Sequence, residues 1–283
     1  CFIGHKADIS FLTKKLNRYI YLDKGYHKGT SEQIYSTIKK NKGYIINLDE
    51  EGGVDFSDGS TLFGRYSISL FDSVDMSFFW GSKQYEMVEK NNKNNTKVIV
   101  SGHPRFEYLK SEFHYLYDEK VKEIKSIYKN YILINTNMGF GNNIKGDDFV
   151  SKNYKDRFKK IKQIISLDKK KRKSFCSLVL GLSKEYNGNI ILRPHPEENH
   201  AYYIDIFKNN KNVHVINKES VIPWILACEL MIHPDCTTAI ESLFLGKRPI
   251  SFLPKNYPDD IVTKLPLDAS KCFTSKSQLL LYV

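Results

Sequence analysis

The stretch ELMIHPDCTTAIESLF, residues 229–244, decides the fold class of this chain. A short apolar run leads to His233 and Pro234, and the paired Thr237 and Thr238 then open a segment with the apolar spacing of an amphipathic helix. A strand, a turn and a helix in this order make the repeating unit of parallel sheets. The unpaired N–H groups at such a helix start favour a phosphate, so the stretch predicts an α/β fold with a phosphate site at Thr237 and Thr238.

Glu241 lies one turn further along the same predicted helix. From there its carboxylate can reach the ribose hydroxyls of a nucleotide whose phosphate lies over the threonines. The structural alternative is that Thr237 only caps the helix and Glu241 completes a pairing that resembles a capping box. We expect the nucleotide-binding role, because the two threonines stand where a strand crosses into a helix.

The same alternation of apolar runs and amphipathic segments extends along the chain. Strands are expected at residues 44–48, 76–80, 97–100, 131–135, 189–193, 212–216, 229–233 and 249–253. Helices are expected at residues 31–40, 82–91, 105–116, 153–167, 173–186, 201–208, 221–228 and 237–245. This rhythm predicts two Rossmann-type, doubly wound parallel-sheet domains that face a cleft. The boundary is placed in the polar stretch near residues 118–130, which gives domains at 1–120 and 130–283.

The composition limits the class of protein. The chain has 283 residues, 41% of them hydrophobic, which is enough for two cores. No run reaches the ~18 consecutive apolar residues of a membrane-spanning helix. The five cysteines show no Cys-x-x-Cys spacing and are expected to be reduced thiols. Because no secretory signal opens the chain, we expect a cytoplasmic protein.

The chain begins with Cys1 rather than Met, so we expect a truncated or processed N-terminus that lacks a first βα unit. The net charge of +11 indicates an anionic partner. Nucleotide phosphate and an anionic membrane surface, reached by peripheral attachment at the inner face of the plasma membrane, both fit this charge. Nucleic acid is not expected, since no known nucleic-acid-binding motif is visible. The basic run at residues 169–173 is interpreted as a solvated helix face or helix entry.

Ligands of parallel sheets bind beyond the carboxyl ends of the strands, so the residues there are the candidates for function. The first predicted strand is followed by Asp49-Glu50-Glu51-Gly52-Gly53. A carboxylate of Glu50 or Glu51, with its pKa raised by like-charged neighbours, can deprotonate an acceptor hydroxyl. The alternative is a solvated acidic turn. Further along, Gly139 and Gly141 follow strand 131–135 and are candidates for the nucleotide-binding loop.

The second half of the chain carries Arg193-Pro194-His195-Pro196 after strand 189–193. The two prolines restrict the backbone around the imidazole. We therefore expect His195 to face the leaving phosphate as hydrogen-bond donor or general acid, with Arg193 and Pro196 beside it. A structural role for a single histidine is the alternative, and it weighs more for His233 at the end of its strand.

Taken in chain order, Glu50-Glu51-Gly52, His195-Pro196 and Thr237-Thr238 resemble the motifs of bacterial sialyltransferases and polysialyltransferases, which have the GT-B fold. The wider pattern, which adds Trp80-Gly81 and Gly102-His103-Pro104-Arg105-Phe106, is similar to bacterial surface carbohydrate biosynthesis proteins of lipopolysaccharide and capsule assembly. The likeness spans about residues 44–253. It includes Kdo transferases among the related enzymes.

The resemblance implies a GT-B glycosyltransferase that moves an acidic sugar, of the sialic acid or Kdo kind, from a CMP-sugar to a glycan or glycolipid acceptor. It makes Glu51 or Glu50 the base, His195 the donor to the leaving group, and Thr237 and Thr238 the phosphate ligands. The CMP-sugar is a substrate, and no cofactor or metal is implied. The only paired aspartates are Asp147-Asp148 and Asp259-Asp260.

Other functions share these motifs. A CDP-glycerol-type polyol-phosphate transferase has the same His-Pro and Thr-Thr features. The setting of His103 and Arg105 resembles that of UDP-sugar 2-epimerases of the GT-B fold. A non-catalytic scaffold of polysaccharide assembly is the third alternative.

Overall fold

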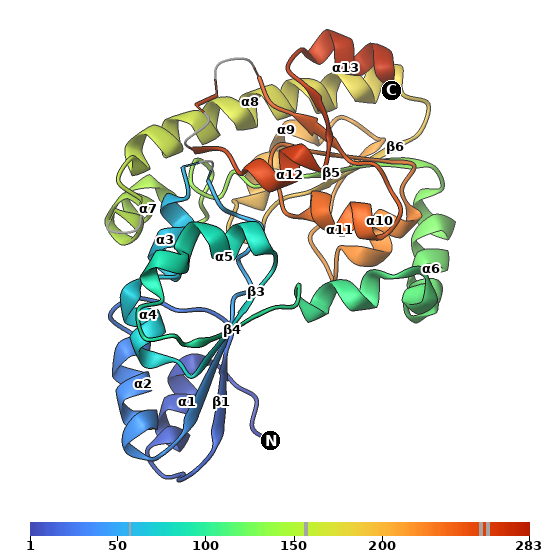
Figure 1. Cartoon of the computed structure of the whole chain (residues 1–283). Coiled ribbons are helices and arrows are strands. Elements are labelled where there is room, and N and C mark those ends of the chain that lie inside the picture. Colours follow the sequence, from blue (N-terminus) through green and yellow to red (C-terminus); the bar gives the residue numbers. More distant parts are fainter. Residues whose placement is uncertain (57, 156–157, 255–256, 259–260) are drawn as a thin grey trace. The chain divides into compact units, whose positions relative to one another are not determined.

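Parallel strand pairing organises both halves of the chain (Figure 1). The computed structural model describes residues 1–56, 58–155, 158–254, 257–258 and 261–283. These residues form two units, Cys1–Arg105 (unit 1) and Phe106–Val283 (unit 2). Unit 1 contains a four-stranded and unit 2 a six-stranded sheet, each flanked by helices. The predicted fold class of two parallel-sheet α/β domains is therefore confirmed.

The sheet of unit 1 has the order β1-β2-β3-β4, which is the order of the chain. Its strands are β1 (Ile20–Asp23), β2 (Tyr44–Leu48), β3 (Met76–Phe79) and β4 (Lys97–Val100). The helices are α1 (Lys6–Thr13), α2 (Ser31–Lys40), α3 (Ser60–Arg65), α4 (Ile68–Ser73) and α5 (Ser82–Val88), followed by the 3₁₀ helix η1 (Glu89–Asn91).

One face of this sheet forms the core of unit 1. Tyr21, Ile45 and Phe79 point toward α2 and α4 and are at most 7% exposed. Successive side chains of a strand alternate between faces. Ile20 and Leu22 consequently lie on the opposite face, where they are 71% and 61% exposed. The covered face also carries the buried polar residues Asp23, Asn47 and Ser77, so the face that the helices cover is not marked by an apolar–polar alternation of the strands.

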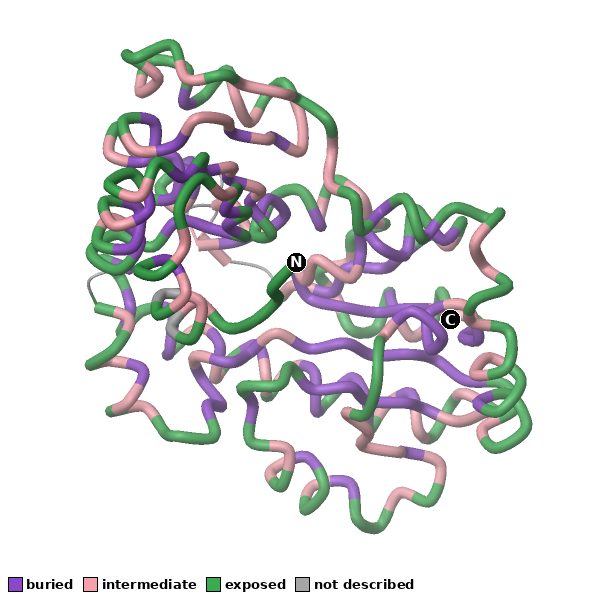
Figure 2. The backbone as a smooth tube through the Cα atoms, turned by 90° about the horizontal axis from the view of Figure 1, so that it is seen from below, coloured by how far each residue is buried: buried purple, intermediate pink, exposed green. Residues whose placement is uncertain are grey.

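The sheet of unit 2 has the order β10-β9-β8-β5-β6-β7. Its strands are β5 (Tyr131–Asn135), β6 (Asn189–Arg193), β7 (Val213–Val215), β8 (Leu230–His233), β9 (Ile250–Phe252) and β10 (Lys271–Phe273). Every residue of the central strand β5 is buried. Figure 2 shows the mostly buried strands β5, β6, β8 and β9 largely in purple, whereas β10 has no buried residue.

The helices of unit 2 follow the strands on both faces. They are η2 (Pro104–Leu109, which begins in unit 1), η3 (Ser111–Tyr117), α6 (Asp118–Tyr128), α7 (Gly146–Tyr154), α8 (Ile161–Glu185), α9 (His200–Phe207), α10 (Ile222–Ala227), α11 (Thr238–Phe244), α12 (Lys264–Asp268) and α13 (Lys276–Tyr282). In Figure 1 the long helix α8 runs along the strands with α13 against it. No helix formed by the described residues is both long and apolar enough to cross a membrane.

The predicted strands at 44–48, 97–100, 131–135 and 189–193 match the structure residue for residue. The other four strands are one or two residues shorter in the structure than predicted. The strands β1 and β10 were not identified from the sequence.

One helix prediction was wrong, because residues 105–116 form the 3₁₀ helices η2 and η3 instead of an α-helix. The helix predicted at residues 173–186 is confirmed as far as Glu185, but it begins earlier than predicted: α8 starts at Ile161 and continues through the basic run 169–173, since Lys and Arg favour helix. The predicted helix 153–167 crosses residues 156–157, which lie outside the described residues. Residues 118–130, the expected domain boundary, largely form α6 within unit 2.

We predict that Ile45→Ala lowers the free energy of unfolding by about 2–5 kcal/mol, because it removes buried methylene groups and leaves a cavity in the core of unit 1. The exposed Ile20, in the neighbouring strand, is the matched control, and Ile20→Ala should change stability by less than about 0.5 kcal/mol. Urea unfolding of the two variants measures both values. Equal losses would contradict the assignment of the two faces.

Candidate functional site

The carboxyl edge of the six-stranded sheet contains most of the predicted binding residues. From β5 the chain proceeds outward to β6 and β7, and from β8 it proceeds in the other direction to β9 and β10. The neighbours β5 and β8 therefore form the topological switch point, where sheets of this kind bind ligands. The loop of Gly139 and Gly141 follows β5, and Thr237 and Thr238 follow β8. His195 follows β6, the other neighbour of β5.

A buried carboxylate joins two of these loops. Glu198 is fully buried, and its Oε1 accepts hydrogen bonds from Thr136 Oγ1 at 2.6 Å, from the Met138 N–H at 3.1 Å and from the His195 N–H at 3.1 Å. Its Oε2 accepts from the Tyr203 hydroxyl and from Asn142 Nδ2. Glu198 thus fixes the loop after β5 against the loop after β6, and it does so through neutral donors.

The ring of His195 is oriented by its own turn. Its Nδ1 accepts the Glu197 N–H at 3.3 Å, so in the neutral ring the proton is on Nε2. The His195 carbonyl accepts the Glu198 N–H at 2.9 Å. His195, Pro196 and Glu197 are exposed. The turn therefore presents an Nε2–H donor at the edge of the sheet.

The glycine loop after β5 packs closely against α8. A Cβ on Gly141 would lie 2.6 Å from Asp168 Cβ and from the Lys169 nitrogen, so only glycine fits. The N–H groups of Phe140 and Gly141 both donate to Asp168 Oδ2, at 3.2 and 3.3 Å. These two donors hold the loop to the helix. Gly139 lies beside the imidazole, since a Cβ on Gly139 would be 3.6 Å from His195 Nδ1.

Arg193 is buried and engaged with the protein. Its two terminal nitrogens donate to the carbonyls of Lys218 and Glu219, at 2.9 and 3.0 Å, and the guanidinium lies over the ring of Trp224. Burial lowers its pKa. These contacts fix the loop after β7, and the expected contact of Arg193 with a nucleotide stays a prediction.

The threonines after β8 do not act as a simple cap. Thr237 is the N-cap of α11, yet its side chain makes no capping hydrogen bond. Thr238 Oγ1 is buried, and its neighbour is the Cys236 thiol, a weak hydrogen-bond partner. Asn137 Oδ1, on the loop after β5, is buried and has no hydrogen-bond partner among the described residues. Glu241 lies one turn into α11 and is 8% exposed. A buried polar atom without a protein partner is uncommon, and Asn137 Oδ1 lies at the switch point.

Below the switch point, a buried ion cluster connects α8 to the end of β8. Lys171 Nζ lies 3.1 Å from Asp235 Oδ1 and 3.5 Å from Asp168 Oδ1. Burial raises the pKa of Asp168 to about 6, against the effect of Lys171. Although burial opposes it, Lys171 lowers the pKa of Asp235, which also accepts from Asn137 Nδ2 at 2.9 Å. The basic run is therefore not entirely solvated, because Lys171 is 5% exposed.

His233 has a structural role. The residue is fully buried, its Nδ1 accepts the Cys236 N–H at 3.1 Å, and its Nε2 lies 2.8 Å from Ser270 Oγ. The Ser270 hydroxyl donates to the Pro266 carbonyl, so Nε2 of His233 is the donor to Ser270. Burial lowers the pKa of His233 to about 4. Its neutral ring holds the turn that precedes Thr237.

The acidic turn of unit 1 combines one buried and two exposed carboxylates. Asp49 is buried and bonded to Arg65 Nε at 3.0 Å, and burial raises its pKa although Arg65 opposes this. Glu50 and Glu51 are exposed, and Lys24 Nζ lies 3.3 Å from Glu50 Oε2. Asp49 thus anchors the turn, and Glu50 and Glu51 are the residues that can meet a substrate.

Trp80 fixes this turn from the end of β3. Its indole N–H donates to the Asp49 carbonyl at 2.6 Å, and its ring lies directly against Gly52, where a Cβ would come within 2.4 Å of it. The ring of His103, after β4, lies 5.3 Å from the indole. The Nδ1 of His103 accepts the Arg105 N–H at 3.2 Å, as in the turn of His195. Unit 1 thus gathers Glu50, Glu51 and His103 at one edge of its sheet.

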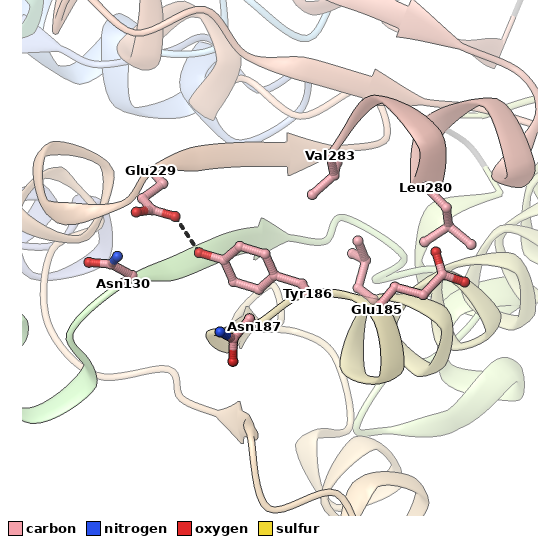
Figure 3. Close-up of a pocket in the computed structure, with 8 residues that line it drawn as sticks. Asn130, Glu185, Tyr186, Asn187, Glu229, Leu280 and Val283 are labelled. Carbon is pink, nitrogen blue, oxygen red and sulfur yellow. Dashed lines mark hydrogen bonds between the residues drawn. The ribbon is translucent and has the colours of Figure 1, made fainter.

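The described residues contain no group of three or more His, Cys, Asp or Glu side chains placed to hold a metal. Of the paired aspartates, Asp147 is bonded to Lys169, and Asp259-Asp260 lie outside the described residues. Figure 3 shows a cavity of about 390 Å³ at the other end of the sheet of unit 2, where the Tyr186 hydroxyl donates to Glu229. Because it lies at the amino ends of the strands and has no predicted site residue, this cavity is not the candidate active site.

Three determinants of the site, Glu198, Asp168 and Lys171, were not predicted from the sequence. Glu198 follows the exposed Glu197 directly, and a sequence does not tell which of two adjacent carboxylates turns inward. Lys171 stands among four other basic residues that look like a solvated run. A usable signal was the i, i+3 spacing of Asp168 and Lys171, which places both on one side of a helix.

Solved structures of similar fold come from nucleotide-sugar enzymes. The UDP-GlcNAc 2-epimerase from Methanocaldococcus jannaschii has a TM-score of 0.59 at 14% identity, over 98% of this chain and 73% of that one. The S. aureus MnaA structure with UDP has a TM-score of 0.54 at 13% identity, over 100% and 71%. The wall teichoic acid polymerase TagF has a TM-score of 0.53 at 13% identity, over 93% and 62%. At these identities the likeness concerns the fold, which is GT-B-like. No protein-family model and no curated protein matches the sequence.

We predict that His233 makes the protein less stable in mild acid. Its pKa is about 4 in the fold and about 6.5 when unfolded, so the unfolded chain binds more protons between these values, and stability falls as the pH falls through that window. From pH 7.5 to 5 the expected loss is about 2 kcal/mol. His233→Gln, which does not titrate, should lack this part of the loss. Urea unfolding of both proteins at the two pH values measures the difference, and identical pH dependence would contradict the buried neutral ring.

Proposed function

We propose that the protein is a nucleotide-sugar enzyme of surface carbohydrate biosynthesis, and that the nucleotide binds at the switch point of unit 2. The observation that carries this proposal is the buried Asn137 Oδ1, which has no partner among the described residues, on the loop after β5, opposite the buried Thr238 Oγ1 at the start of α11, whose neighbour is the weakly bonding Cys236 thiol. A ligand with both donors and acceptors, such as a ribose with its phosphate, satisfies them. His195 adds an Nε2–H donor for a phosphate oxygen.

His195 acts in this proposal as a hydrogen-bond donor. Its Nδ1 is occupied by the Glu197 N–H, so protonating both ring nitrogens would break the turn. A neutral imidazole can stabilise charge that develops on a leaving phosphate without transferring a proton. Of the two roles expected from the sequence, donor and general acid, the geometry favours the donor.

UDP is the nucleotide that we propose first. The structures of similar fold include the M. jannaschii epimerase in complex with UDP-GlcNAc and UDP, and MnaA with UDP. The CMP-sugar and the acidic sugar expected from the sialyltransferase and Kdo-transferase likeness have no such support. We therefore prefer a UDP-sugar, and of the possible reactions we prefer 2-epimerisation of a UDP-N-acetylhexosamine.

In this reaction the proposed base, Glu51 or Glu50 of the acidic turn, removes the C2 proton as the C1–O bond to the UDP leaving group breaks, so that a double bond forms between C1 and C2. UDP then adds back at C1 as a proton returns to the other face of C2. Glycosyl or polyol-phosphate transfer to a glycan or glycolipid acceptor is the second candidate. The motif order in the sequence and the TagF fold likeness favour it. There the same carboxylate would deprotonate the acceptor hydroxyl.

We predict that UDP and UDP-GlcNAc stabilise the protein in a thermal-shift panel that also contains CMP, CDP and GDP. A ligand at 100 times its Kd adds about 2.7 kcal/mol to the free energy of unfolding. Preferential stabilisation by CMP would restore the sialyltransferase-like function, and no stabilisation by any nucleotide would exclude this proposal.

A second experiment on the same protein distinguishes 2-epimerisation from glycosyl or polyol-phosphate transfer. Incubated with UDP-GlcNAc in D₂O without acceptor, an epimerase replaces the C2 proton by deuterium, which NMR detects. Glu51→Gln is the control that should bind UDP and lose exchange if Glu51 is the base. UDP binding without exchange in the wild-type protein would favour transfer.

We predict that His195→Asn weakens UDP binding by about tenfold, the size of one hydrogen bond to a charged group. The Asn Oδ1 can accept the Glu197 N–H as Nδ1 does, so the turn and the melting temperature of the free protein should be retained. Titration calorimetry measures the affinity. The control is His214→Asn on β7, which should bind UDP as the wild type does. Unchanged affinity in His195→Asn would remove His195 from the site.

A further inference from the structure

Two bonds between side chains and the main chain hold the segment from His195 to Glu198. The side chain of Glu198 accepts the N–H of His195, and the side chain of His195 accepts the N–H of Glu197. The main chain closes the turn through the Glu198 N–H and the His195 carbonyl. The fully buried carboxylate of Glu198 therefore holds the main chain from which the imidazole extends, and the Glu197 N–H orients the ring.

The two oxygens of Glu198 have different partners. Oε1 holds the groups nearest the proposed ligand: the Thr136 hydroxyl, the Met138 N–H and the His195 N–H. Oε2 faces the Tyr203 hydroxyl on α9 and Asn142. Tyr203 is 1% exposed and lies in the core on one face of the sheet. One side of the carboxylate is thus directed to the site and the other to the core.

We propose that Glu198 is a positioning residue of the nucleotide site, which fixes the position of His195 relative to the loop after β5. This inference rests on the proposed function. Glu198 does not touch the ligand. It acts because the Thr136 hydroxyl and the N–H groups of Met138 and His195 lose their shared acceptor when it is removed. Main-chain bonds such as that from the Asn199 N–H to the Asn142 carbonyl still join the two loops, so the expected change is a local one at these three groups.

The division between the two oxygens provides a matched pair of variants. Glu198→Ala removes all five hydrogen bonds to this carboxylate, including those to Met138 and His195. Tyr203→Phe removes only a hydrogen bond on the Oε2 side. Both variants lower stability, since each leaves buried polar groups without a partner. Only Glu198→Ala also removes the bonds from Thr136, Met138 and His195 at the carboxyl edge of the sheet.

Glu198→Gln is the conservative variant. Its side-chain oxygen can take the place of Oε1 and keep the bonds from Thr136, Met138 and His195. Its amide then faces the Tyr203 oxygen, which can accept, and loses the bond from Asn142 Nδ2, because both groups are donors. If Glu198 positions the site through Oε1, this variant should recover most of the affinity that Glu198→Ala loses.

The experiment measures the Kd for UDP by titration calorimetry, and the melting temperature of the free protein, in the wild type and the three variants. We expect at least a tenfold weaker affinity in Glu198→Ala, a Kd within twofold of the wild type in Tyr203→Phe at a lowered melting temperature, and recovery to within about threefold in Glu198→Gln.

If Tyr203→Phe weakens UDP binding as much as Glu198→Ala does, the affinity merely follows the melting temperature. That result would overturn the positioning role and leave Glu198 a structural one. An unchanged Kd in Glu198→Ala would overturn it as well. Should Glu198→Ala not fold, Glu198→Asp takes its place, because its carboxylate stands one methylene short of the Thr136, Met138 and His195 donors. Weaker UDP binding by Glu198→Asp than by Tyr203→Phe supports the role, and equal affinities contradict it. If the wild type binds no UDP, the proposed function itself has failed.

Discussion

The carboxylate of Glu198 is the constraint on which the candidate site of unit 2 depends. A buried carboxylate without a cation is costly unless hydrogen bonds replace its hydration, and here five donors do so. These donors come from the loop after β5, the loop after β6 and helix α9, so hydrogen bonds to one carboxylate link these three segments. The main chain of His195 is among the groups that the carboxylate holds.

A second buried charge system serves the neighbouring strand end. Lys171 joins Asp168, which holds the glycine loop, to Asp235, which precedes Thr237. The neutral ring of His233 stabilises the same turn by accepting the Cys236 N–H. Three cations near the switch point, Lys171, Arg172 and Arg193, are thus engaged with protein groups. The proposed phosphate contacts are consequently an imidazole, hydroxyls and backbone N–H groups, rather than a cluster of free cations.

The sequence predicted the sheets well because the strands that carry them, such as residues 131–135, are continuous apolar runs bounded by polar turns. It also placed Glu50, Glu51, His195, Thr237 and Thr238 at strand ends, since position along a parallel strand follows directly from its boundaries. The environment of each side chain was harder to predict. Arg193 looks like a ligand-binding residue in the sequence, and it is engaged inside the fold, whereas the structural role favoured for His233 agrees with its buried contacts. Glu198 shows no pattern, and Trp80 appeared only as part of the wider motif pattern, because the contacts of both residues join distant segments.

Hydrogen–deuterium exchange with and without UDP tests the proposed nucleotide site most directly, because it reports on the backbone amides that Glu198 and the switch point hold. We expect UDP to slow exchange at residues 136–142, 195–198 and 236–239 of unit 2. Protection confined to the amino ends of the strands, around residues 185–187 and 229, would place the ligand at the opposite edge and contradict a site at the switch point.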